Sequence, residues 1–260
     1  MYKLRELIQE SKEETSLIEK KSENIFVRFF KKLKSFFIIR LDKDSSNDNK
    51  NLEMVIFDLD GTLWSVDETT EVSVNEYLRN NNIDINVPME VVRKSMGCTF
   101  AETAENYFPN LEKSERERLL DEALTYNNQK ILEMGGNVYS NVEKTLMKLK
   151  EKYKLTIVSN CGAGYIEAFL EYSKFDKFFS DFIAASKEKM SKADAIKTII
   201  ERNNVTKAIY VGDTDKDKAA AEGADIEFIQ ALYGFGNDLN SKYSIDEFEA
   251  LPEMLNDISV

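Results

Sequence analysis

A short segment near position 58 constrains the fold of this chain more than any other feature of its sequence. Residues 54–57 form an apolar run, and Asp58, Asp60 and Gly61 follow it directly. Short continuous apolar runs are typical of strands buried in a parallel sheet. Ligands of open α/β sheets bind beyond the carboxyl ends of the strands, where the two carboxylates would stand. The segment therefore predicts a buried strand with an acidic site at its end, and an Asp-rich turn without function is the alternative.

The composition excludes several kinds of chemistry. The 260 residues carry a net charge of -12, include no histidine and contain two cysteines, Cys98 and Cys161. Without histidine, Ser-His-Asp and Cys-His catalysis and histidine metal ligands are excluded. The acidic balance argues against general nucleic-acid binding. Two cysteines make neither a disulfide framework nor a zinc site, and we find no signal peptide or long apolar run, so we expect a cytoplasmic protein.

Residues 1–50 differ from the rest of the chain because basic residues outnumber acidic ones there. We expect a helical N-terminal extension, with aromatic and basic residues of 25–40 at amphipathic helical spacing. Such a helix could contact an anionic membrane surface or a protein partner, although packing against the main domain or a second copy is favoured. Residues 42–51 are polar and read as a linker. We expect this extension to be dispensable for chemistry.

The stretch that follows the first strand has a helical pattern throughout. Helices are predicted at 69–82, 88–95, 99–107 and 114–134. Ser114 and Glu117 are spaced as a capping box, and the glycines at 135–136 would end the last helix. We therefore predict that residues 67–137 form a helical insertion that acts as a lid.

From residue 141 onward, strands and helices alternate as in a parallel sheet. Further strands are predicted at 155–158, 182–185, 208–211 and 226–229, and helices at 141–152, 163–172, 192–203 and around 215–222. The expected fold class is α/β, with residues 51–66 and 138–260 forming the core that carries the inserted helical domain.

Three of these strands end in polar residues that suit one kind of chemistry. The residues that would meet at one sheet edge are Asp58, Asp60, Ser159, Asn160, Lys192, Asp213 and Asp217. Several clustered carboxylates repel one another unless a cation lies among them, and ligands that are all oxygen indicate magnesium. A carboxylate nucleophile, a lysine and a metal are what phosphoryl transfer needs, and the Ser159 hydroxyl and Asn160 amide could hold phosphoryl oxygens.

With these motifs in this order, the sequence resembles the haloacid dehalogenase superfamily. Residues 58–62 (Asp-Leu-Asp-Gly-Thr), Ser159-Asn160, a lysine and residues 212–217 match its four motifs. Within the superfamily the chain is most similar to phosphatases with a helical C1 cap, of the phosphoglycolate phosphatase kind. The resemblance implies a Rossmann-like parallel sheet and covers residues 54 to about 236.

The resemblance also implies roles for individual residues. Asp58 would be the nucleophile and Asp60 the acid and base, while Ser159 binds phosphate and Lys192 steadies both the nucleophile and the phosphoryl group. Magnesium would be held by the Asp58 carboxylate, the Asp60 backbone carbonyl and Asp213. Asp217 would support the metal through water or through the lysine.

Some of these assignments have competitors in the sequence itself. Lys187 and Lys189 compete with Lys192, which is favoured because it opens the helix after the third strand. Asp217 is spaced from Thr214 as a capping box and could simply cap its helix.

Trp64, Cys161 and residues 97–99 also lie near the expected site. Trp64 is expected to pack at the lid hinge rather than touch substrate. Cys161 is expected to be a small, unreactive residue, since no partner base is evident. Residues 97–99 fall where the superfamily has its specificity loop, and an ordinary helix connection is equally consistent with the sequence.

The expected function is a magnesium-dependent phosphatase that acts on a small phosphorylated metabolite through an aspartyl-phosphate on Asp58. A phosphomutase of the same superfamily is the first alternative; it would need basic cap residues, and only Arg93 and Lys94 lie near the predicted loop. A catalytically idle binding protein is the second alternative. Superfamily dehalogenases lack a carboxylate at the position of Asp60, so its presence favours phosphoryl chemistry.

Overall fold

The computed structural model describes residues 52–258. The N-terminal extension predicted at 1–50, its amphipathic segment at 25–40 and the linker at 42–51 therefore lie outside the described residues. Among the helices that are described, none is both long enough and apolar enough to cross a membrane.

A six-stranded parallel sheet forms the centre of the described part, in the order β5-β4-β1-β6-β7-β8. Its strands are β1 (Met54–Phe57), β4 (Lys154–Ser159), β5 (Asp181–Ala184), β6 (Ala208–Gly212), β7 (Glu227–Ala231) and β8 (Tyr243–Ile245). The first five confirm the strands predicted from apolar runs. The sixth is a three-residue edge strand that the sequence analysis did not predict.

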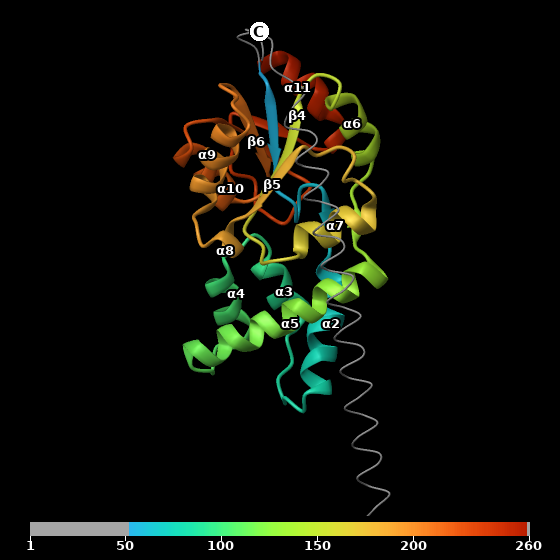
Figure 1. Ribbon diagram of the computed structural model, residues 1–260, viewed down its shortest axis with the longest axis vertical. Helices are drawn as coiled ribbons and strands as arrows, with labels where there is room; N and C mark the ends of the chain where they lie inside the picture. The colour runs from blue at the N-terminus through green and yellow to red at the C-terminus, as the bar shows by residue number, and fades with distance from the viewer. Residues whose placement is uncertain (1–51, 259–260) are drawn as a thin grey trace, which may run out of the picture. The chain divides into compact units, whose positions relative to one another are not determined.

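Helices connect the strands and cover both faces of the sheet (Figure 1). They are α6 (Val142–Leu149), α7 (Tyr165–Ser173), α8 (Ala185–Glu188), α9 (Lys192–Arg202), α10 (Asp215–Gly223) and α11 (Leu251–Ile258), with the 3₁₀ turn η1 (Phe248–Ala250). The helices predicted at 141–152, 163–172, 192–203 and 215–222 are confirmed. The short α8 and the C-terminal η1 and α11 were not predicted.

Alternate residues of β1 belong to two different hydrophobic clusters. Met54 and Ile56 lie with residues of α9 and α10, whereas Val55 and Phe57 lie with residues of α6, α7 and α11. All four side chains are fully buried. Each contributes about 1.5–3 kcal/mol through burial, so the strand that carries the acidic motif is anchored from both sides of the sheet.

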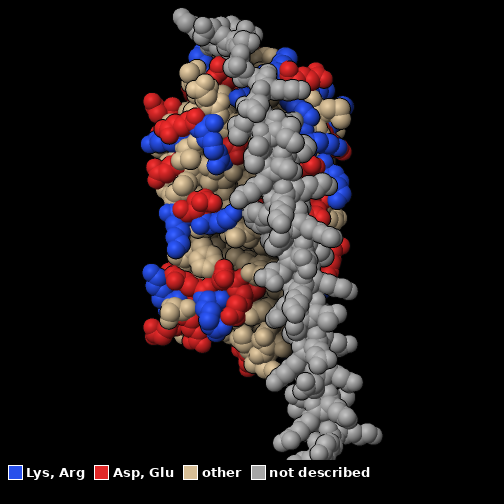
Figure 2. Space-filling view, viewed as in Figure 1, with Lys and Arg blue, Asp and Glu red and all other residues tan. Residues whose placement is uncertain are grey.

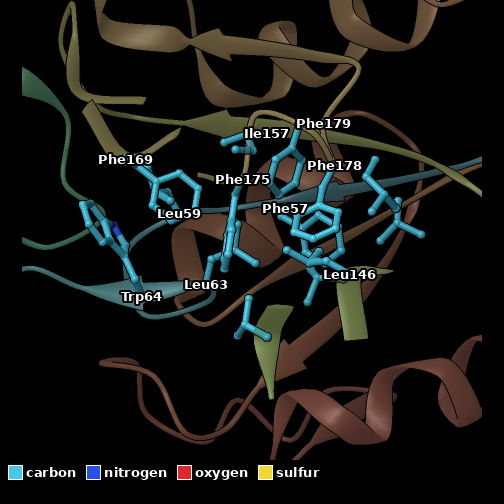
Figure 3. Close-up of a cluster of buried hydrophobic side chains, with 14 of the residues drawn as sticks. Phe57, Leu59, Leu63, Trp64, Leu146, Ile157, Phe169, Phe175, Phe178 and Phe179 are labelled. Carbon is cyan, nitrogen blue, oxygen red and sulfur yellow. The ribbon is translucent and has the colours of Figure 1, made fainter. Parts of the chain in front are cut away.

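Aromatic rings fill much of the cluster on the α6–α7 face (Figure 3). Phe57 meets Phe179 edge to face at 6.2 Å, and Phe175 lies 5.8 Å from Phe169 and 5.4 Å from Phe178, all between ring centroids. Such pairs add roughly 0.5–1.5 kcal/mol each beyond the area they bury. The packing therefore fixes the chain on the side of the sheet from which α7 reaches the site.

Four helices form the inserted segment, which lies beyond one end of the sheet in Figure 1. They are α2 (Asp67–Asn80), α3 (Met89–Ser95), α4 (Phe100–Tyr107) and α5 (Lys113–Met134). They confirm the predicted run of helices without strands, and they share a hydrophobic cluster of their own that includes Val74, Leu78 and Leu120. We call this helical segment the cap; its predicted domain limits, at residues 67 and 137, stay a prediction.

The predicted capping box at the start of α5 is wrong. Glu112 is the N-cap, with extended backbone, and its carbonyl accepts the amides of Glu115 and Arg116. Ser114 therefore already lies inside the helix, where its side chain cannot cap the first turn. The predicted end is confirmed, because Gly135 follows the helix with a φ of 73°.

A two-stranded antiparallel ribbon marks where the chain leaves the core for the cap and where it returns. It consists of β2 (Trp64–Ser65) and β3 (Asn137–Val138), with Trp64 opposite Val138. The Trp64 ring is fully buried, 4.8 Å from the Phe169 ring between centroids. This confirms the expectation that Trp64 packs at the hinge.

Candidate active site

The sheet order brings three sequence motifs to one edge. β1 lies between β4 and β6, and Phe57 pairs with Ile157 on one side and Val211 on the other. All three strands run in the same direction, so the residues that follow them, Asp58 and Asp213, and Ser159 at the end of β4 come to the same edge.

Lys192 joins two of the carboxylates in a buried cluster. Its Nζ lies 2.8 Å from Asp58 Oδ1 and 2.5 Å from Asp217 Oδ1, and all three side chains are at most 4% exposed. Burial opposes charging of the ammonium, but the two carboxylates outweigh it and raise the pKa of Lys192. Removing one member would leave buried charge uncompensated, which is why such clusters hold their geometry.

Asp217 both caps a helix and belongs to this cluster. Its Oδ2 accepts the Thr214 amide at 2.9 Å and the Asp213 amide at 3.2 Å, and its own amide donates to Thr214 Oγ1 at 3.3 Å, which completes the predicted capping box. Burial would raise the pKa of Asp217, but Lys192 and Thr214 hold it below the ordinary value. Asp217 is therefore an ionised anchor with both oxygens already bonded.

Asp213 has one oxygen without any protein partner. Its Oδ2 accepts the amides of Phe235 at 2.7 Å and Gly236 at 3.2 Å, whereas Oδ1 is buried and makes no hydrogen bond to a described residue. Burial and the charges of Asp217 and Asp58 raise the pKa of Asp213 to about 8. An unsatisfied buried carboxylate oxygen is costly unless a cation faces it.

Three carboxylates are close enough to share such a cation. One oxygen from each of Asp58, Asp213 and Asp217 lies within 4.8 Å of the others, and all three residues are buried. Burial and the Asp217 charge raise the pKa of Asp58 to about 6, against the pull of Lys192. Oxygen ligands with excess negative charge fit a hard divalent cation.

The glycine of the first motif is required by close packing against this acidic group. Gly61 has a φ of 81°, and a Cβ placed there would lie 2.2 Å from Asp213 Oδ2. Any side chain at this position would both strain the backbone and displace the carboxylate.

Asp60 is held by a residue that the sequence analysis did not single out. The Tyr165 hydroxyl, on the first turn of α7, donates a hydrogen bond to Asp60 Oδ1. Burial and the neighbouring Asp58 charge raise the pKa of Asp60 to about 7 despite this bond. A carboxyl group with this pKa can give and take a proton near neutrality.

A cavity of about 430 Å³ separates this edge of the core from the cap. Asp60, Ser159, Asn160 and Cys161 line it on the core side, with residues of α3, α4 and α5 opposite. Its volume lies within the 300–1,000 Å³ range typical of small-molecule sites. Burial raises the pKa of the Cys161 thiol well above its usual value, which agrees with an unreactive residue.

Polar contacts hold the cap loop at residues 95–99 and α4 against the core. The Asn160 amide nitrogen donates to the Gly97 carbonyl at 3.0 Å, so one of its two hydrogens is used by the cap. Lys216 of the core lies 2.6 Å from Glu102, and its ammonium also contacts Cys98 Sγ at 3.3 Å. The loop at residues 97–99, where the specificity loop was expected, therefore lines the cavity through Gly97 and Cys98 and contacts the core directly.

Comparison with known proteins matches this architecture. The sequence model of the haloacid dehalogenase-like hydrolases aligns with residues 55–231, which include every motif at the sheet edge. The chain belongs to this family. The cavity between core and cap is therefore the candidate active site of this hydrolase.

Relatives of the hydrolase include phosphatases. The phosphoglycolate phosphatase of Psychrobacter arcticus is 26% identical over 221 residues, which cover 78% of this chain and 95% of that protein. A haloacid dehalogenase-like family hydrolase from Streptococcus pneumoniae has the same fold, with a TM-score of 0.67 and 20% identity over 78% of this chain and 98% of its own.

The fold is also shared with an enzyme of different chemistry. A 2-haloacid dehalogenase from Pseudomonas syringae pv. Tomato superposes with a TM-score of 0.57 at 20% identity, covering 80% of this chain and 99% of that one. The fold by itself therefore does not decide which bond the hydrolase breaks, and the residues of the site must decide it.

Proposed function

We propose that this hydrolase is a magnesium-dependent phosphatase that acts on a small phosphorylated metabolite through an aspartyl-phosphate on Asp58. The observation that carries the proposal is the buried group at the end of β1. Asp58 is held by Lys192 at 2.8 Å and lies beside Asp213, whose Oδ1 makes no hydrogen bond within the described part of the chain. Phosphoryl transfer requires a nucleophilic carboxylate, an ammonium group held in place and a carboxylate oxygen that can bind a metal ion.

In the first step, Asp58 would attack phosphorus in line with the leaving oxygen. Lys192 would offset negative charge on the phosphoryl group, and the Ser159 hydroxyl and the second Asn160 amide hydrogen would bind its oxygens. Asp60 would give its proton to the departing alkoxide. In the second step, Asp60 would take a proton from the water that attacks the aspartyl-phosphate and so restore free Asp58.

The residues at the sheet edge fit a magnesium ion. Asp58, the Asp60 backbone carbonyl and Asp213 would hold it, with Asp213 Oδ1 as the oxygen that now has no partner. Asp217 would support the ion only indirectly, because both its oxygens are bonded to Lys192, Thr214 and Asp213. Bound magnesium would neutralise charge between the nucleophile and the phosphate dianion.

Two further points favour a phosphatase over the alternatives. The names of the relatives include phosphoglycolate phosphatase and a pyrophosphatase, both enzymes of phosphate hydrolysis. A phosphomutase would need cations on the cap to reorient a bisphosphate, yet the described cap residues that line the cavity include no lysine or arginine. Arg93 pairs instead with Asp67 at 2.6 Å.

Hydrolysis of p-nitrophenyl phosphate, with magnesium and after chelation, tests the proposal. We expect release of phosphate that depends on magnesium, and acid quench should trap phosphate on Asp58. The Asp58→Asn variant, whose side chain has nearly the same shape, should show neither. Hydrolysis of 2-haloacids without hydrolysis of aryl phosphate would contradict the proposal, as would full activity in the chelated enzyme.

A further inference from the structure

Two helices of the cap, α4 and α5, contribute several side chains to the wall of the cavity that faces the core. On α4, Thr103 and Tyr107 are four residues apart and therefore lie on the same face. On α5, Asp121 and Thr125 have the same spacing. All four line the cavity. These four residues bring three hydroxyls and one carboxylate to the cap side of the cavity, beside the other polar lining residues Thr70, Ser95, Asn127 and Asn128.

Tyr107 brings a hydrogen-bonding group to the wall of the cavity. Tyr107 is only 5% exposed, and its hydroxyl makes no hydrogen bond to any described residue. Burial, together with the charge of Asp60 and with Cys98, raises the pKa of Tyr107, so the phenol stays protonated and remains a donor. Because the Tyr107 side chain lines the cavity, its hydroxyl is placed to donate a hydrogen bond to a bound ligand.

The cap side of the cavity carries little charge. Asp121 is the single charged residue among the described cap residues that line the cavity. Apolar side chains of Met96, Phe100 and Leu124 surround the polar ones. Lys187 and Lys189 also line the cavity, but they follow β5 on the core side, where Ser186 bonds the Asn160 carbonyl at 2.6 Å. The two lysines therefore belong to the core side of the cavity and not to the cap.

We infer that the substrate is a phosphate ester of an uncharged, polyhydroxylated alcohol such as a sugar or polyol, and that Tyr107 binds one of its hydroxyls. The inference rests on the proposed phosphatase activity and deepens it. Hydroxyl groups of the substrate can accept from Tyr107 and donate to Asp121, while its C–H surface packs on the apolar side chains. A leaving group with a carboxylate would instead meet Asp121 and no cap cation.

The inference sets this chain apart from the relatives named phosphoglycolate phosphatase. Glycolate is a two-carbon acid with one carboxylate and no hydroxyl once it is phosphorylated. Its carboxylate could accept hydrogen bonds from the cap hydroxyls, but it has no hydroxyl to donate to Asp121 and would place like charges across the cavity. A site built to bond hydroxyls discriminates strongly against ligands that lack them.

A comparison of three phosphate esters tests the inference. With magnesium, we expect kcat/KM for sorbitol 6-phosphate or glucose 6-phosphate to exceed that for phosphoglycolate by at least about 10-fold. The ester p-nitrophenyl phosphate has no hydroxyl for the cap to bind and serves as the reference for chemistry alone. A preference for phosphoglycolate over both neutral esters would overturn the inference.

Two variants separate the role of Tyr107 from a structural one. Tyr107→Phe keeps the ring that packs on Phe108 and removes only the hydroxyl. We expect KM for the neutral esters to rise about 3- to 10-fold and KM for p-nitrophenyl phosphate to change less. Tyr126→Phe removes a cap hydroxyl that bonds Glu76 outside the cavity, and it should change neither value. Equal losses on all substrates would assign Tyr107 a structural role.

A charge reversal should move the preference in the opposite direction. Asp121→Lys places a cation where the neutral esters need an acceptor, so the ratio of phosphoglycolate to sugar phosphate turnover should rise. An unchanged ratio would remove Asp121 from the site. If the wild-type protein hydrolyses no aryl phosphate, the proposed function fails; if it hydrolyses aryl phosphate but shows no preference for neutral esters, only this inference fails.

Discussion

The core and the cap contribute different chemistry to the same cavity. The core offers buried charge that is held in place by other charge, as in the group of Asp58, Lys192 and Asp217. The cap offers hydroxyls and apolar groups with a single carboxylate, Asp121. A substitution within the core cluster would leave a buried charge without its partner, which is destabilising. Substitutions on the cap side of the cavity do not carry that cost. In the proposed mechanism, the reaction depends on core residues whose substitution is costly, and selectivity depends on cap residues whose substitution is not.

The core and the cap also differ in how they are stabilised. The carboxylates of Asp58 and Asp213 follow central strands that are buried on both faces of the sheet. The cap has a separate hydrophobic cluster, and its polar contacts to the core include those of Asn160 with Gly97 and of Lys216 with Glu102. On the face seen in Figure 2, acidic and basic side chains are interspersed over the described residues. Substitutions can test how far this division goes.

The largest effect is expected for Asp58→Asn. The amide cannot act as a nucleophile, so turnover of every phosphate ester should fall by about 10⁴-fold or more, whatever the leaving group. Steady-state kinetics with p-nitrophenyl phosphate measures the loss, and circular dichroism checks that the variant is folded. A variant that keeps more than a few per cent of wild-type turnover would show that another residue is the nucleophile.

The next effect distinguishes the buried lysine of the core from an exposed one. Lys192→Met leaves the Asp58 and Asp217 carboxylates without their shared partner, which should lower the free energy of unfolding by roughly 3–5 kcal/mol. Lys197→Met changes an exposed lysine of the same helix and should shift it by less than about 0.5 kcal/mol. Urea titration measures both. Similar decreases in the free energy of unfolding for the two variants would mean that Lys192 does not stabilise the buried carboxylates.

Asp60→Asn should lower the rate by roughly 10²–10⁴, because proton transfer is lost while the backbone carbonyl remains. The loss should be larger for alkyl esters, whose leaving groups need a proton, than for p-nitrophenyl phosphate. With the aryl ester, phospho-enzyme should accumulate on Asp58, since the second step also needs the base. Equal losses for both kinds of ester, with no trapped intermediate, would exclude the acid and base role.

The smallest effect is expected where cap and core meet in solvent. Lys216 and Glu102 have side chains 34% and 48% exposed, so Glu102→Gln should lower the free energy of unfolding by at most about 1 kcal/mol. The bond to Lys216 lowers the pKa of Glu102 to about 2. The contribution is therefore fully present above about pH 4.5 and is lost as the pH falls through about 2. Urea titrations of both proteins at pH 7 and pH 3 should show the difference shrinking at the lower pH.

Sequence patterns were sufficient for the central strands and for the residues that follow them. Apolar runs ending in carboxylates mark β1 and β6, and parallel pairing then brings Asp58 and Asp213 together without further information. Lys192 could be preferred over Lys187 and Lys189 because it opens a helix, and its ammonium does contact Asp58. Its catalytic role, like the roles of the other site residues, stays a proposal.

The sequence could not show contacts that depend on how helices are oriented. Tyr165 and Tyr107 look like ordinary aromatic residues of amphipathic helices, and only the packing of α7 and α4 directs one hydroxyl to Asp60 and the other to the cavity. The ribbon of β2 and β3 has two residues per strand, which is too short for a period-2 pattern. The contact of Lys216 with Glu102 joins residues far apart in sequence and has no local signal.

The ribbon of β2 and β3 gives the chain a modular architecture. Ser65 pairs with Asn137, so the chain returns to the core beside the point at which it left. For the sheet, residues 66–136 are one long loop whose ends are already tied together, and lengthening such a loop costs little closure entropy. The cap is in this sense an insertion whose size does not affect the sheet. It can be replaced, shortened or exchanged between homologous chains while the order and register of the six parallel strands stay the same.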